Sequence, residues 1–182
     1  MTPLRSSRRS NVKVHPDPAD ASTLREVFGT FATGVTVLTV GGQTPHGMTA
    51  NSFTTVSMDP PLVLVCVKRD AVMHDSLAEA GGFAVNVLAS QQETVARYFA
   101  DHSRPLGRAQ FDAVEWAAGE RTGAPLIADA FAHIECDLWR TYDGGDHSIF
   151  LGVPVQVRRR SEEDALLFLC GRFCQLNLTS TG

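Results

Sequence analysis

The sequence predicts a mainly β protein, a closed antiparallel barrel with a few helices packed outside it. Short alternating or β-branched apolar stretches fill much of the chain, and turns rich in Gly, Pro and Asp separate them. Only three short segments have helical periodicity. The 182 residues, 43% hydrophobic and 20% charged, suit one globular domain. The strand–helix–strand alternation that a Rossmann dinucleotide site needs is absent.

The first part of the chain predicts a helix, a hairpin and a buried strand. Apolar residues recur at helical spacing over 24–31, with Ser22 or Thr23 available as the N-cap. A β-branched strand over 35–40 and a returning arm over 45–50 form the hairpin. Residues 62–67 are apolar on both faces, so we expect a central strand buried on both sides.

The rest of the chain predicts two more helices and an all-β second half. Helices are expected at 71–80 and 91–100, the second with Val95, Tyr98 and Phe99 on one side. A polar excursion packed outside the core is expected over 101–123. The strands expected here are 83–88, 131–138, 149–157 and a closing strand at 166–173, with a turn at 143–146.

Composition and charge also limit the domain organisation, the binding partners and the cellular location that we expect. Residues 1–20 are expected to form a flexible N-terminal tail, 21–178 a single domain and 179–182 a C-terminal tail. No apolar segment follows Arg8 and Arg9, so export is not expected. The net charge of −4 argues against nucleic acid, and the longest apolar run is too short to span a membrane. Four cysteines within apolar segments suit free thiols in the cytoplasm.

Metal and acyl-transfer chemistry are not expected. The chain has no glycine-rich phosphate loop and no nucleophile elbow. His133 and Cys136 lie three positions apart on an alternating strand, so they point to opposite faces and do not share a metal ion. The candidate sites are therefore those that suit an organic ligand.

The first candidate site is the polar cluster Thr49, Ala50, Asn51 and Ser52. It precedes the rigid turn Asp59-Pro60-Pro61, in which two prolines restrict the backbone. Such residues at a strand end often only cap and turn the chain. Alternatively, the Asn51 and Ser52 side chains and their backbone amides hydrogen-bond the polar edge of a ring system or a phosphate.

Two further candidates lie in the second half. Gly144-Gly-Asp-His147 forms either a solvated hairpin turn or a turn that folds over a bound ring, where His147 donates a hydrogen bond or passes a proton. Gly171, Arg172 and Phe173 interrupt an apolar strand. Arg172 lies either at a strand edge in water, or toward a pocket or partner subunit where its guanidinium meets a phosphate.

Four stretches together carry a resemblance. Gly47-Met-Thr-Ala-Asn-Ser-Phe with the Asp-Pro-Pro turn, Phe83-Ala-Val-Asn-Val-Leu, Gly145-Asp-His with Phe150-x-Gly, and Gly171-Arg-Phe occur in this order. The region from about Leu24 to Leu176 thereby resembles the NAD(P)H:flavin oxidoreductases of the flavin-reductase-like, FMN-binding split-barrel family.

The resemblance implies an antiparallel split β-barrel with Greek-key features. It also implies a homodimer that binds FMN or FAD near the subunit interface and takes hydride from NADH or NADPH. Such an EC 1.5.1-type enzyme supplies reduced flavin by diffusion to a flavin-dependent monooxygenase. The alternatives are a flavin carrier, or a split-barrel flavoprotein oxidoreductase that acts on a substrate other than flavin.

The resemblance also implies roles for individual segments. Thr49, Ala50, Asn51 and Ser52 match the segment that contacts the isoalloxazine and ribityl chain. Cys66, Val67, Lys68 and Arg69 begin the segment that runs along the flavin and its phosphate. His147 and the segment Gly171, Arg172 and Phe173 match the nicotinamide side.

One departure from the family pattern concerns the phosphate. The family commonly has small hydroxyl residues after the central strand, where this chain has Asp70, Val72 and Met73. A carboxylate at Asp70 repels a phosphate. We therefore expect Ser52, Lys68 and Arg69 to hold the phosphate instead.

Overall fold

The computed structural model describes residues 20–161 and 164–175. The predicted tails therefore lie outside the described residues, except for Asp20, and so does the predicted domain boundary at Leu178.

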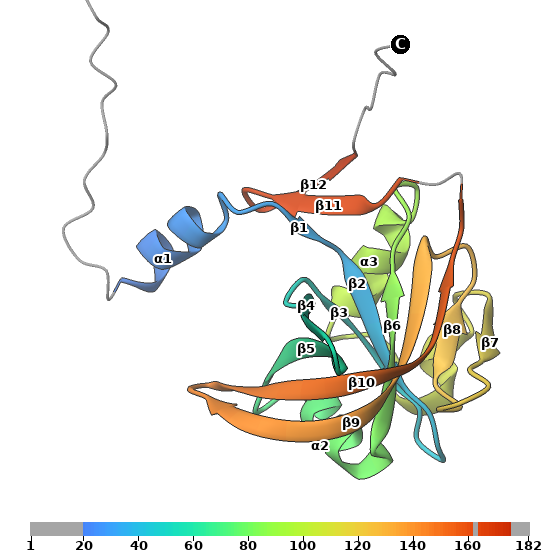
Figure 1. Cartoon of the computed structure of the whole chain (residues 1–182). Helices are drawn as coiled ribbons and strands as arrows, with labels where there is room; N and C mark the ends of the chain where they lie inside the picture. Colours follow the sequence, from blue (N-terminus) through green and yellow to red (C-terminus); the bar gives the residue numbers. More distant parts are fainter. Residues whose placement is uncertain (1–19, 162–163, 176–182) are drawn as a thin grey trace, which may run out of the picture.

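A seven-stranded antiparallel sheet forms the centre of the molecule (Figure 1). Its strand order is β3-β2-β6-β9-β10-β5-β4, so β3 and β4 are edge strands and the barrel is open between them. The closed barrel predicted from periodicity is thus wrong, and the split barrel implied by the resemblance is confirmed. The strands are β2 (Thr36–Val40), β3 (His46–Ala50), β4 (Thr54–Met58), β5 (Pro61–Lys68), β6 (Gly82–Val87), β9 (Ala132–Gly144) and β10 (His147–Arg159).

The main core lies between this sheet and helix α2 (Val72–Ala80). Strand β5 was predicted to be central and buried on both sides, but it is the second-last strand of the sheet. The side-chain row of Val63, Val65 and Val67 is buried. In the opposite row only Leu62 is buried, and Leu64 and Cys66 are half-buried.

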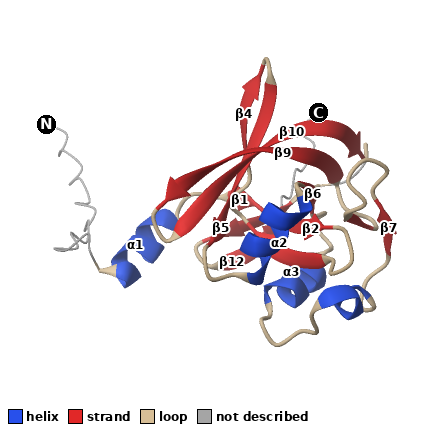
Figure 2. Ribbon diagram, turned by 90° about the horizontal axis from the view of Figure 1, so that it is seen from below, coloured by secondary structure: helices blue, strands red, loops and turns tan. Residues whose placement is uncertain are grey.

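Helix α1 (Ala21–Phe28) begins one turn earlier than predicted. The N-cap is Asp20, whose carboxylate accepts hydrogen bonds from the backbone N–H groups of Ser22 and Thr23. The helix projects away from the body (Figures 1 and 2) and buries none of its side chains. Its apolar face and the residues after it are exposed: Val27 by 54%, Phe28 by 68% and Phe31 by 77%.

A second core lies under helix α3 (Glu93–Ala100) and the 3-10 helix η1 (Gly107–Phe111). The ring of Phe111 lies 5.6 Å from both the Phe99 and the Trp116 rings. Phe111 is fully buried, so the excursion over 101–123 is part of a core and not only packed outside it, which corrects the prediction. The short sheet of β7 (Trp116–Ala118) and β8 (Pro125–Ile127) completes this layer.

The buried side-chain amide of Asn86 links the large sheet to the short sheet of β7 and β8. Its Nδ2 donates to the carbonyl of Val37 over 2.9 Å, and its Oδ1 accepts from the backbone N–H of Ile127 over 2.8 Å. A polar residue within the apolar pattern of β6 is thereby satisfied on both sides.

A separate three-stranded sheet contains the end of the described chain (Figure 1). It consists of β1 (Thr33–Gly34), β11 (Leu166–Leu169) and β12 (Arg172–Gln175). The single closing strand predicted over 166–173 is therefore wrong. A tight turn at Cys170 and Gly171, with φ of 49° and 75°, reverses the chain between β11 and β12.

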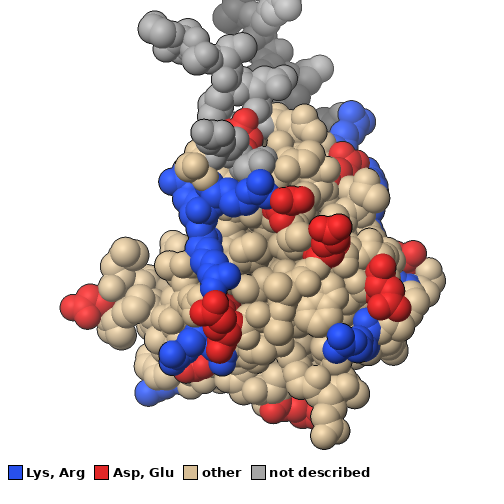
Figure 3. Space-filling model, turned by 90° about the vertical axis from the view of Figure 1, so that its right-hand side faces the viewer, with Lys and Arg blue, Asp and Glu red and all other residues tan. Residues whose placement is uncertain are grey.

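The long hairpin of β9 and β10 confirms the turn predicted at 143–146, since His147 pairs with Gly144 across it. Ion pairs join Arg158 to Glu120 and Arg160 to Asp129. Basic and acidic side chains also lie next to one another on the face shown in Figure 3. No described helix has the length and apolar character needed to cross a membrane.

Candidate functional site

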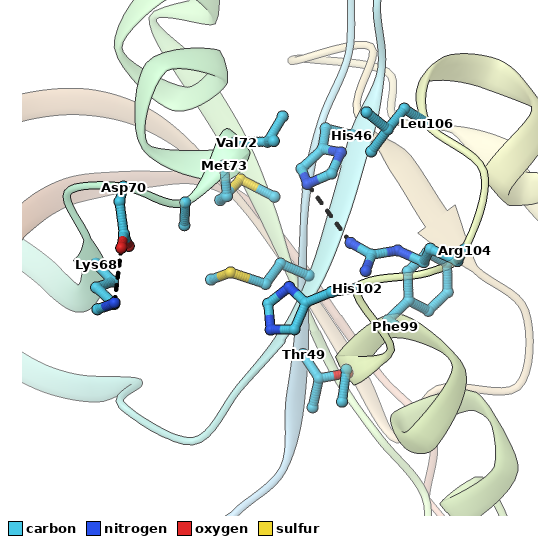
Figure 4. A pocket seen from close by; sticks show the side chains of 13 residues that line it. His46, Thr49, Lys68, Asp70, Val72, Met73, Phe99, His102, Arg104 and Leu106 are labelled. Carbon is cyan, nitrogen blue, oxygen red and sulfur yellow. Dashed lines mark hydrogen bonds and ion pairs between the residues drawn. The ribbon is translucent and has the colours of Figure 1, made fainter.

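A cavity of about 650 Å³ lies between three segments that are far apart in the sequence (Figure 4). Its volume falls within the range of about 300–1,000 Å³ typical of small-molecule sites. The segments are strand β3, the connection from β5 into α2, and the end of α3 with the loop after it. The lining residues are His46, Met48, Thr49, Lys68, Asp70, Ala71, Val72, Met73, Phe99, Ala100, His102, Arg104 and Leu106.

Strand β3 packs directly on α3 and so fixes one wall of the cavity. A Cβ atom on Gly47 would lie 2.7 Å from Cε1 of Phe99, so only glycine allows this approach. The Thr49 hydroxyl donates a hydrogen bond to the carbonyl of Ala96 over 2.7 Å. This hydroxyl therefore holds the wall in place, and toward a ligand it can act only as an acceptor.

The opposite wall contains a charged pair and the start of α2. Lys68 Nζ lies 2.7 Å from Asp70 Oδ2, and this hydrogen bond raises the pKa of Lys68 and lowers that of Asp70. The N-cap of α2 is Ala71, which makes no side-chain cap. The first backbone N–H groups of the helix therefore contribute positive potential beside Met73.

The third wall holds an arginine beside a buried histidine. Arg104 Nη1 donates to the carbonyl of Asp101 over 2.6 Å, and Nη2 donates to the carbonyl of Gly47. Arg104 Nη2 also lies 3.5 Å from His46 Nε2 (Figure 4). Burial, followed by the charge of Arg104, lowers the pKa of His46 to about 4, so this imidazole is neutral near pH 7.

The structure brings several of the predicted site segments together. Thr49 and Lys68 line the cavity. Ser52 Oγ donates to the Cys66 carbonyl over 2.9 Å and accepts from its N–H over 3.1 Å, which ties the polar cluster to β5. Lys68 pairs in register with His147 across β5 and β10. Residues 49–52, 66–69 and 147 therefore lie near one end of the sheet.

Other predicted residues do not reach the cavity. Asn51 is exposed, and Ala50 uses its carbonyl to accept from the Thr36 hydroxyl. Val67 is fully buried in the core, so its side chain is not available to a cofactor. The segment 171–173 belongs to the separate three-stranded sheet, where Phe173 packs against Phe168.

Ser52, Lys68 and Arg69, which are predicted to hold the phosphate, each make a contact within the chain. Ser52 is bonded to Cys66, and Lys68 is paired with Asp70. Arg69 Nε donates to the carbonyl of Gly145 over 3.0 Å, and its Nη2 lies 3.1 Å from Asp143. Lys68 and Arg69 keep further N–H donors beside these contacts, and their role toward the phosphate stays a prediction.

Sequence reasoning missed the wall that follows α3. His102 and Arg104 lie in the stretch that was interpreted as an external excursion, and His46 was placed only in a hairpin arm. No spacing links these residues, because their proximity depends on packing between β3 and α3. The one available signal was two basic side chains directly after the amphipathic helix.

The residues around the cavity suit a flat, anionic organic cofactor. Met48, Ala71 and Val72 offer apolar surface, whereas Lys68 and Arg104 carry positive charge. Arg104 donates to two backbone carbonyls and forms no ion pair within the described residues, so its charge is available to an anionic ligand. A flavin phosphate or diphosphate has the matching charge.

The fold and this cavity define an antiparallel split barrel that can hold such a cofactor. The model of the family described as "Flavin reductase like domain" matches residues 28–177. The chain therefore belongs to the flavin-reductase-like family.

Three relatives are informative. The NADH-dependent FAD reductase of Streptomyces globisporus is 59% identical over 157 residues, which cover 86% of each chain. The structure of the S. globisporus C-1027 NADH:FAD oxidoreductase SgcE6, in complex with NAD and FAD fragments, matches with a TM-score of 0.86 and 55% identity over 90% of this chain and 97% of that one. BorF, the flavin reductase component of a bacterial two-component tryptophan halogenase, matches with a TM-score of 0.83 and 56% identity over 86% of this chain and 98% of its own.

Proposed function

We propose that the protein is an NADH-dependent flavin reductase of the EC 1.5.1 type that supplies reduced flavin to a separate flavin-dependent oxygenase. The observation that carries this proposal is the cavity, with apolar and cationic walls, in a flavin-reductase-like barrel. The 59% identity to an NADH-dependent FAD reductase favours NADH as the donor and FAD as the acceptor. The proposed catalytic unit is a single domain over residues 21–178.

The flavin and the dihydronicotinamide, when bound, supply hydride-transfer chemistry themselves. The chain contributes binding and orientation. Met48, Ala71 and Val72 provide an apolar surface that excludes water from one side of the cavity. The first N–H groups of α2 provide positive potential on that side, which favours a ligand that gains negative charge.

We assign the remaining predicted residues as follows. Residues 49–52 and 66–69 serve the flavin side, largely through backbone groups, and His147 serves the nicotinamide side. Arg172 is exposed and lies outside the cavity of its own chain. We therefore assign residues 171–173 to the cavity of a partner subunit.

A homodimer is part of this proposal. Helix α1 projects from the body with an exposed apolar face, as expected of an element that packs on another subunit (Figure 1). Sedimentation equilibrium should give twice the monomer mass, and Phe28→Ser should shift the equilibrium toward monomer. We also propose a cytoplasmic location, which the free thiols of Cys66, Cys136, Cys170 and Cys174 support.

The proposed activity is tested with purified protein under anaerobic conditions. NADH or NADPH is mixed with FMN or FAD in the four combinations, and the visible flavin absorbance is followed. We expect rapid bleaching with NADH, faster with FAD than with FMN. Absence of bleaching in all four mixtures would overturn the proposal. Bound flavin that NADH does not reduce would indicate a carrier instead.

A further inference from the structure

The guanidinium of Arg104 lies on the cavity wall with incomplete bonding. Nη1 donates to the carbonyl of Asp101 and Nη2 to the carbonyl of Gly47, whereas Nε is buried and lacks a partner. In Figure 4 the group reaches across the wall toward His46, above the Phe99 ring. The buried Nε cannot be reached from the cavity, but Nη1 and Nη2 each carry a second N–H that can donate to a ligand.

The charge of the Asp101 carboxylate acts on Arg104, but the two groups do not form an ion pair. None of the ion pairs within the described residues includes Arg104. The Asp101 carboxylate accepts from the N–H and the hydroxyl of Ser103 over 2.8 Å each. Two carbonyls and a neutral ring therefore surround a half-buried cation, and burial lowers its pKa. Removing a cation from water in this way is costly unless an anion binds it.

The histidine beside Arg104 does not supply that anion. His46 is 5% exposed, and its Nδ1 lies 3.4 Å from Gln110 Nε2. A neutral imidazole has one acceptor nitrogen, so it accepts from Gln110 or from Arg104 but not from both. Gln110 also accepts from the backbone N–H of Gly47 over 2.8 Å. This network fixes the position of the loop beneath Arg104 and contains only neutral groups, so it supplies no anion to the guanidinium.

We propose that Arg104, with His102 beside it on the same loop, is the phosphate-binding subsite of the cavity. The planar guanidinium matches the oxygens of a phosphate, and the apolar side chains of Met48 and Val72 are left to contact the ring system. This inference rests on the proposed function, since it assigns a position to the phosphate of a bound cofactor. The phosphate belongs to the flavin (FMN or FAD) or to the nicotinamide cofactor, and the two sources are separated experimentally.

The test compares ligands that differ by the phosphate. Riboflavin, FMN and FAD are titrated into wild-type protein and Arg104→Ala by flavin fluorescence, and NADH is titrated by its own fluorescence. We expect Arg104→Ala to weaken FMN and FAD about 10- to 100-fold, the size of a charge-assisted hydrogen bond, and riboflavin by much less. Arg104→Lys should restore part of the loss, because it keeps the charge but not the fork.

The matched control is Arg108→Ala. Arg108 lies four residues further on, stacks over the Trp116 ring at 5.4 Å and does not line the cavity. It should leave all four affinities unchanged. A selective loss of NADH binding in Arg104→Ala would assign the subsite to the nicotinamide cofactor. Equal losses for riboflavin, FMN and FAD, or no loss for any ligand, would overturn the subsite.

These binding measurements do not depend on turnover. Wild-type protein that binds FMN more tightly than riboflavin but reduces neither refutes the proposed reductase and leaves the subsite intact. Riboflavin affinity retained in Arg104→Ala, together with an unchanged melting temperature, shows that the variant is folded. Conversely, normal flavin reduction with unchanged FMN affinity in Arg104→Ala refutes only the subsite.

Discussion

Lys68 and Asp70 form an ion pair of 2.7 Å on the wall of the cavity. Asp70 was expected to repel a cofactor phosphate, but its charge is largely offset by Lys68. The same contact also occupies the Lys68 ammonium. The net potential of this wall is therefore small, and the positive charge of the cavity lies mainly on the side of Arg104.

Replacing Asp70 by Asn should release Lys68 and tighten the binding of FMN and FAD. Both side chains are solvent-exposed, so we expect a gain of no more than about fivefold. Riboflavin, which has no phosphate, should show no gain. Titrations at low and high salt test whether the gain in affinity is electrostatic, since it should shrink as salt screens the Lys68 charge. An equal gain for riboflavin would exclude the electrostatic explanation.

His147→Ala should weaken nicotinamide binding more than flavin binding. His147 lies at the start of β10, across from Lys68, and its Nδ1 is 2.7 Å from the Asp146 carboxylate. This contact orients the ring, and His147→Gln, which keeps a donor, should recover part of the loss. Separate NADH and flavin titrations give the two dissociation constants. Equal losses in both would contradict a role on the nicotinamide side.

The buried His46 should make stability pH-dependent. The fold lowers the pKa of His46 from its ordinary 6.5 to about 4. Between these pH values the unfolded chain is protonated at His46, whereas the folded chain is not. The stability present above pH 6.5 should therefore be lost progressively as pH falls toward 4. Melting temperatures of wild-type protein and His46→Gln, measured between pH 7 and 5, check this. The variant should have the shallower slope, and parallel slopes would rule out His46 as the cause.

Asn86→Ala should destabilise the fold without touching the cavity. The substitution leaves the Val37 carbonyl and the Ile127 N–H without their partner in a buried layer. Each unsatisfied group costs about 1–3 kcal/mol. Urea unfolding measures the loss. Asn51→Ala, at an exposed asparagine, is the matched control and should leave the unfolding midpoint unchanged.

The sequence predicted those elements whose residue pattern is set by local structure. Alternation and turn residues predicted the hairpins at 35–50 and 131–157, because both signals are local. The resemblance led to Lys68 and His147, which the sheet register places side by side. Helical periodicity predicted an apolar face near Phe28, but it does not say what covers that face. Here no part of the described chain buries it.

The position of Arg104 on the cavity wall could not be predicted either, because it also depends on packing between distant segments. Arg104 lies 58 residues from His46 in the sequence, and only the packing of Phe99 against Gly47 brings their walls together. Neither residue belongs to a recognisable motif. By contrast, the prediction of one closing strand over 166–173 was wrong for a local reason. Cys170 and Gly171 adopt positive φ values, which a continuous strand excludes.

The cavity walls come from residues 46–49, 68–73 and 99–106, and no single segment is a binding site by itself. The unfolded chain therefore has no binding site for the cofactor, and cofactor binding raises the free energy of unfolding. A ligand at a hundred times its dissociation constant adds about 2.7 kcal/mol. A cell short of flavin would then keep a larger share of this protein open to proteases, so the abundance of the protein would follow the supply of its ligand.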